Sequence, residues 1–135
     1  MRTLLLAALL LSATPLAVLA EEPGHSDADD VPLYEGAWNV HFEGQRTARF
    51  VLNDWQGTWT ETGPARSVTA ACRGKKIPVT IQHSTTTHLE FTVWGSQVSR
   101  DCPDIGYLLE PAGAGALQGQ SGTKDKVRMT RARRG

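Results

Sequence analysis

The side chains that could do chemistry in this 135-residue chain are spread thinly along it. Serine, histidine and aspartate all occur, but no Gly-x-Ser-x-Gly elbow or comparable turn presents a nucleophile. Glu43, Glu61 and Glu90 fall in strand-like segments, without the paired arrangement that acid–base catalysis uses. The sequence therefore predicts a protein with no catalytic activity.

The two histidines of the second half flank a turn at residues 84–87. A metal-binding or proton-linked pair would need His83 and His88 close together. However, His83 shares the parity of Ile81, whereas His88 opposes Leu89, so the alternation predicts rings on opposite sides. We expect no metal site and no cofactor.

The first twenty residues have the pattern of a cleavable export signal. Arg2 provides the positive start, residues 4–11 form the apolar stretch, and small residues precede a cleavage point after Ala20. The apolar stretch is too short to span a bilayer, and no later stretch could do so. We expect a periplasmic or secreted protein, without stable insertion in a membrane.

Cleavage would leave 115 residues, which is an ordinary size for one domain. It removes Arg2 and no acid, so 13 bases face 14 acids, and this near-neutral charge argues against nucleic acid as a partner. Residues 21–32 are acidic, lack apolar periodicity and predict a flexible leader. Its His25 and nearby aspartates lack the spacing of a calcium loop. Residues 33–135 would form the folded domain.

Cys72 and Cys102 are the two cysteines of the chain. An exported chain meets an oxidising compartment, so the expected product is a disulfide between them. A zinc pair or a reactive thiol is less consistent with the sequence, because no second cysteine pair or nearby histidine completes a ligand set.

From residue 36 onward, apolar and polar residues alternate in roughly nine short runs separated by turn residues. Period-2 alternation at this spacing is typical of an all-β fold. Short connections favour up-and-down pairing, and closure removes exposed edges. We therefore predict a single antiparallel β-barrel of about eight short strands, with one disulfide. The runs lie at residues 38–42, 48–52, 57–62, 68–72, 77–81, 89–93, 105–109, 117–121 and 126–131.

Gly36 and Trp38 open the first run, and Arg131 lies on the last. If these strands meet at the seam of a barrel, the guanidinium can lie on the indole face and close that end. This Gly-x-Trp with a late arginine resembles the calycin group of lipocalins, avidins and small bacterial protease inhibitors, and Gly57-Thr58-Trp59 is similar to an avidin segment. The resemblance implies a small barrel with a binding role. It does not imply biotin, because Val40 stands where avidins have a polar residue.

Aromatic residues supply the candidate binding sites. Trp38, Phe50, Trp59 and Tyr107 fall on inward faces, where they either fill the core or line a cup for a small apolar or aromatic ligand. Two other tryptophans are candidates for contact with a protein. Trp55 lies beside a turn at a barrel end. Trp94 is out of phase with its inward neighbours, so we expect it to be exposed.

Two binding functions stay open on these residues. In the first, the barrel mouth binds a small apolar ligand. In the second, the protein inhibits an exported protease or lysozyme through residues 95–104 or through the leader. An enzyme would need a polar cluster inside the barrel mouth, and the sequence does not show one. The oligomeric state stays open.

Overall fold

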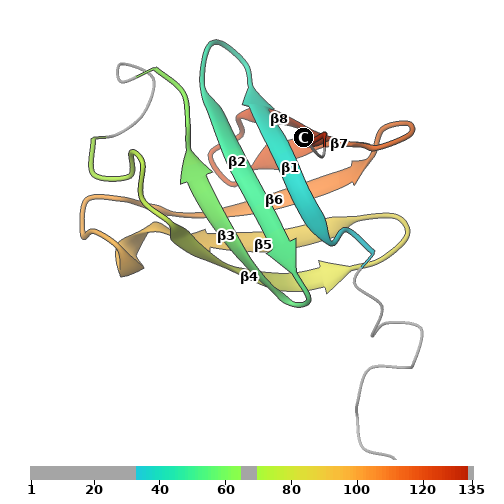
Figure 1. Cartoon of the computed structure of the whole chain (residues 1–135), viewed down its shortest axis with the longest axis horizontal. Coiled ribbons are helices and arrows are strands. Elements are labelled where there is room, and N and C mark those ends of the chain that lie inside the picture. The colour runs from blue at the N-terminus through green and yellow to red at the C-terminus, as the bar shows by residue number, and fades with distance from the viewer. Residues whose placement is uncertain (1–32, 65–69, 134–135) are drawn as a thin grey trace, which may run out of the picture.

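The computed structural model describes residues 33–64 and 70–133, so the predictions for residues 1–20 and 21–32 lie outside the described residues. Within the described part, eight antiparallel strands pair in chain order, and the last pairs with the first to close a barrel (Figure 1). The predicted fold class is confirmed. The strands are β1 (Gly36–Phe42), β2 (Thr47–Asn53), β3 (Gln56–Glu61), β4 (Ile77–Ser84), β5 (Leu89–Trp94), β6 (Asp104–Pro111), β7 (Ala116–Ser121) and β8 (Lys126–Arg131).

Period-2 alternation explains how the strands form a barrel. From Trp38 in β1 and from Ala48 in β2, every second residue is buried and the residues between them are exposed, because successive side chains point to opposite faces of a strand. In Figure 1, β1–β3 cross over β4–β6, as walls on opposite sides of the barrel do. A 3-10 turn, η2 (Gly95–Gln97), follows β5. Among the described residues, no helix has the length and hydropathy needed to cross a bilayer.

The predicted run at residues 68–72 does not form a strand in the part that the structure describes. The alternation at residues 68–72 begins outside the described residues, and Ala70–Cys72 form turns, followed by a single bridge from Arg73 to Glu61. The alternating residues there are small, and they offer little apolar area to hold a strand on the core. Cys72 is buried because of its disulfide rather than because it lies on a strand.

Aromatic side chains fill the barrel. The rings of Phe50 and Phe91 stack with centroids 4.9 Å apart, and Phe91 stacks on Tyr107 at 5.0 Å. Trp59 joins this stack through Tyr107, with ring centroids 4.9 Å apart. Small barrels are commonly filled by their own side chains in this way. The interior is therefore a packed core, and open space is found near its ends and on its outer face.

The end of the barrel near residue 36 is closed. Trp38 pairs with Arg131 in the β1–β8 register, and the Arg131 guanidinium carbon lies 4.2 Å from the indole centroid. The predicted contact is present. The Trp38 Nε1–H donates to the Tyr34 carbonyl oxygen at 2.8 Å. Gly36 has a φ of 116°, and a Cβ there would lie 3.0 Å from Arg131 Nη1, so the turn beneath the arginine requires a glycine.

Candidate functional site

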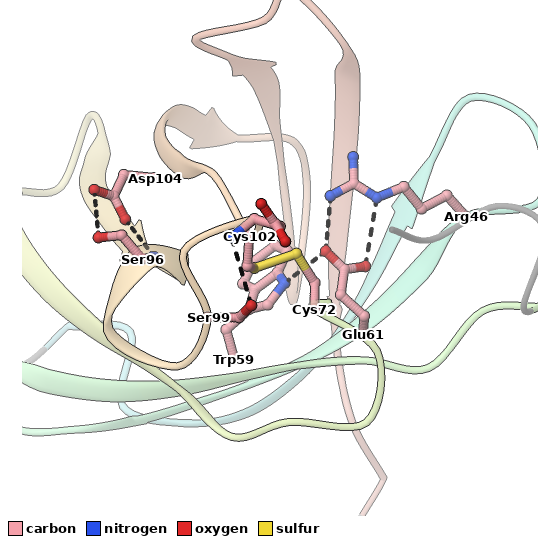
Figure 2. The surroundings of a disulfide bond; sticks show 9 residues. Arg46, Trp59, Glu61, Cys72, Ser96, Ser99, Cys102 and Asp104 are labelled. Carbon is pink, nitrogen blue, oxygen red and sulfur yellow. Dashed lines mark hydrogen bonds and ion pairs between the residues drawn. A yellow bond between two sulfur atoms is a disulfide. The ribbon is translucent and has the colours of Figure 1, made fainter. Parts of the chain in front are cut away.

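The opposite end of the barrel is open and contains a pocket of about 250 Å3. The pocket lies where the ends of β3 and β5 meet the starts of β4 and β6, next to the β1–β2 and β7–β8 turns. Figure 2 shows its ion pair and the disulfide on its rim. The lining residues are Arg46, Trp59, Glu61, Cys72, Ile77, Val93, Cys102, Pro103, Ile105, Tyr107, Thr123 and Asp125.

A two-point ion pair occupies one side of this mouth. Arg46 Nη2 lies 2.7 Å from Glu61 Oε1, and Arg46 Nε donates to Glu61 Oε2 at 3.4 Å (Figure 2). The Trp59 Nε1–H donates to Glu61 Oε1 at 3.2 Å. Asp125 Oδ2 stands 3.9 Å from Arg46 Nη1 at the outer edge. The buried carboxylate of Glu61 is thus held by three N–H groups, as a buried charge requires.

Arg46 also covers an aromatic ring at this end. Its guanidinium carbon lies 4.1 Å from the Phe42 centroid, which repeats at the mouth the Arg131–Trp38 contact of the closed end. Burial works against the charge on Arg46, but the hydrogen bond and the charge of Glu61 outweigh it and raise the pKa of the guanidinium. The arginine therefore stays charged and fixed at the rim.

Tyr107 and Trp59 border the pocket on its inner side, and both are almost fully buried. Burial raises the pKa of the Tyr107 hydroxyl well above its ordinary value, and the nearby positive charge of Arg46 offsets only part of this rise. The hydroxyl is therefore neutral at physiological pH, and it can both donate and accept a hydrogen bond.

This polar cluster is not predicted from the sequence. It forms because Glu61 points inward from the end of β3 and Arg46 reaches it from the β1–β2 turn. A signal was present, since Glu61 has the same parity as the inward Trp59. The ion-pair partner of Glu61 could not be identified, because Arg46 lies in a turn, where period-2 alternation does not predict the direction of a side chain.

The disulfide fixes the rim of the pocket. Cys72 and Cys102 are bonded, with Cα atoms 5.1 Å apart, as predicted (Figure 2). The bond is consistent with an oxidising, exported compartment. The loop that carries Cys102 is also held by Asp104, whose carboxylate accepts from the Ser96 amide at 2.8 Å and the Ser96 hydroxyl at 2.9 Å. A Cβ on Gly95 would come within 2.3 Å of the Pro103 carbonyl oxygen, so the loop is packed tightly.

The four predicted ligand residues separate into two groups. Trp59 and Tyr107 line the mouth pocket. Trp38 and Phe50 are only 2% and 0% exposed, and Trp38 lies at the closed end. Trp59 and Tyr107 are themselves only 0% and 3% exposed, so a ligand in the mouth would meet little of these two rings, and it could not reach the other two.

The two candidate protein-binding tryptophans border one groove on the outside of the barrel, of about 530 Å3. Trp55 lies in the β2–β3 turn, half-buried and packed against the core. The expectation that Trp94 is exposed is wrong, because it too is half-buried. Its Nε1–H donates to Thr80 Oγ1 at 3.0 Å, so the indole lies across the neighbouring strand β4.

The histidines do not face opposite sides. The His83 and His88 ring centroids are 6.1 Å apart, because a β-bulge between Ile81 and His83 breaks the alternation and turns His83 outward. His83 Nε2 lies 3.9 Å from Glu90 Oε2. Over residues 33–64 and 70–133, no three His, Cys, Asp or Glu side chains gather as metal ligands do.

Comparisons with known proteins add no relative to this description. No family model matches the chain, and searches of curated proteins and of solved structures found no match.

Proposed function

We propose that this chain is an exported, non-catalytic binding protein of the calycin type, whose barrel mouth receives a small aromatic or apolar ligand. The observation that supports this most strongly is the mouth pocket, whose lining combines apolar side chains, among them the partly buried Ile105, with a fixed ion pair beside the buried rings of Trp59 and Tyr107. Pockets with apolar walls and a few convergent polar groups are typical of small-molecule sites.

The size and polarity of the pocket limit the ligand. A volume of about 250 Å3 lies just below the range usual for drug-sized ligands, so a ligand of one or two rings fits best. The rim carboxylate of Asp125 favours a ligand that carries a hydrogen-bond donor at its outer edge. Arg46 is engaged by Glu61, which makes it a wall of the pocket rather than a free anion receptor.

Export is part of the proposal. Residues 1–20 would be removed as a signal peptide, and the mature chain would work in the periplasm or outside the cell. The disulfide on the pocket rim supports this location, because such bonds persist in oxidising compartments.

A titration with small aromatic amines and indoles tests the mouth. Binding of indole or tryptamine should shift the amide resonances of β3 and β6 around the pocket in a nuclear magnetic resonance spectrum of the disulfide-bonded protein. Replacing Ile105 with Trp fills the mouth and should abolish the shifts. Val51→Trp, on an exposed site of β2, is the matched control and should bind normally. Binding that persists in Ile105→Trp would contradict the proposal.

A second function, inhibition of an exported enzyme, is favoured by the loop at residues 95–103. The disulfide, the 3-10 turn and the hydrogen bonds from Ser96 to Asp104 hold this loop before any partner arrives. Preorganised loops bind with a smaller loss of conformational entropy. The test is capture from envelope or culture fluid, followed by an activity assay of any captured protease or lysozyme. Arg100→Glu, at the exposed part of the loop, should weaken inhibition, and a chain without residues 21–32 tests the leader.

A further inference from the structure

The groove between Trp55 and Trp94 lies on the outer face of the barrel, separate from the mouth pocket. It is built by β3 and β4, with contributions from the end of β5 and from η2. We propose that this groove binds an uncharged oligosaccharide, lying across β4 between the two indoles.

The charge of the groove is the first argument. About one residue in five of this chain is charged, yet none of the ten residues that line the groove is. Three glutamines and a threonine provide its polar groups instead: Gln56, Gln82, Gln97 and Thr80. Each glutamine amide offers two donors and one acceptor oxygen, which suits the adjacent hydroxyl groups of a sugar. A charged ligand would find no counter-ion in this lining.

The indoles are the second argument. The indole N–H of Trp94, its only side-chain donor, is occupied by Thr80 Oγ1 at 3.0 Å, so the ring offers a ligand its face and not its N–H. The face of an indole is electron-rich and attracts the polarised C–H groups on the flat side of a sugar ring. An extended proline-rich peptide would instead gain from a free indole N–H. Half-burial and the bond to Thr80 fix the ring in advance, which lowers the entropy lost on binding.

The backbone of β4 is the third argument. Its register with β5 shifts between Ile81 and His83, so Gln82 is the extra residue of a β-bulge, and its exposed side chain borders the groove. Bulges re-aim side chains and are frequent beside functional sites. On the same strand, Pro78 gives the groove a rigid apolar floor between Thr58 of β3 and the end of β5.

Titration of the isotope-labelled, disulfide-bonded protein tests the proposal, with cellohexaose, maltohexaose and the hexamer of N-acetylglucosamine as probes. At least one should produce saturable shifts confined to the amides of β3, β4 and residues 94–97. No saturable shift with any of the three below about 10 mM would overturn the proposal. Saturable shifts located elsewhere would also overturn it. So would binding in the groove of a proline-rich decapeptide and of none of the three sugars.

Variants separate stacking from hydrogen bonding. Trp94→Ala should weaken binding of the active hexasaccharide about tenfold or more, while Trp94→Phe, which keeps a ring, should restore part of the affinity. Gln82→Ala, at an exposed site, should weaken it about two- to tenfold without disturbing the fold. Leu108→Ala, 52% exposed on β6, is the control and should bind normally. Unchanged affinity in both Trp94→Ala and Gln82→Ala would overturn the assignment.

Ile105→Trp keeps the two sites distinguishable. The variant fills the mouth and should leave sugar binding intact, because Ile105 does not border the outer groove. Loss of oligosaccharide binding in this variant would place the sugar in the mouth and contradict the groove assignment.

Discussion

The guanidinium of Arg131 covers the Trp38 indole at 4.2 Å and also donates to the carbonyl oxygen of Glu35. One side chain from the last strand thus joins the first strand and the segment that precedes it. The contact lies at the seam where β8 pairs with β1, so it bears directly on closure of the barrel.

Replacing Arg131 with Ala should lower the free energy of unfolding by about 1–3 kcal/mol, because the variant loses both the contact with the indole and the hydrogen bond to Glu35. The midpoint of urea denaturation measures this. Arg128→Ala, at an exposed position on the same strand, should change stability by less than about 0.5 kcal/mol. Equal effects of the two substitutions would show that the capping contact contributes nothing.

Reduction of the Cys72–Cys102 bond should destabilise the barrel by roughly 3–4 kcal/mol in the chain-entropy view, given a sequence separation of 30 residues. For a domain of this size, that corresponds to a fall in melting temperature of about ten degrees or more. Calorimetry with and without reductant gives the measurement, and a Cys72→Ser/Cys102→Ser variant separates loss of the bond from effects of the reductant. An unchanged melting temperature would contradict the expectation.

The two ion pairs of the β1–β2 turn should differ sharply in their contribution to stability. Arg46→Ala leaves the buried Glu61 carboxylate without its main partner and should cost about 2–4 kcal/mol, less than a fully buried pair because Arg46 is partly exposed. Lys126→Ala breaks the exposed pair with Glu43, 3.6 Å apart, and should cost less than about 1 kcal/mol. Chemical denaturation of both variants measures the two changes in the free energy of unfolding. Similar losses would show that burial of Glu61 has no energetic consequence.

Alkaline pH should destabilise the protein through Tyr107. Its folded-state pKa is raised above the ordinary value of 10.0, mainly by burial, so between the two values the folded state holds a proton that the unfolded state has lost. The free energy of unfolding should therefore fall as the pH rises above about 10. Burial also raises the pKa of Tyr34, so Tyr107→Phe should remove a large part of this slope rather than all of it. Urea denaturation of both proteins across the alkaline range tests this, and an unchanged slope in the variant would refute it.

Alternation is what makes the barrel predictable from the residues. Most strands carry apolar residues at every second position, and most of the turns between them are short, so burial of one face and closure of the edges leave few other arrangements. The pairing of Trp38 with Arg131 follows from the same parity. The run at 68–72 shows where this reasoning fails, because alternation of small residues does not supply the burial that a strand needs.

The order of residue types was enough to predict the all-β class, the strand faces, the Cys72–Cys102 bond and the closed end of the barrel. The three-dimensional fold was needed to place Arg46 beside Glu61 and to bring Trp55 and Trp94 to one groove. The reason is physical: period-2 alternation encodes which face a strand residue occupies. The neighbours of turn and bulge residues depend on how the whole sheet curves and closes.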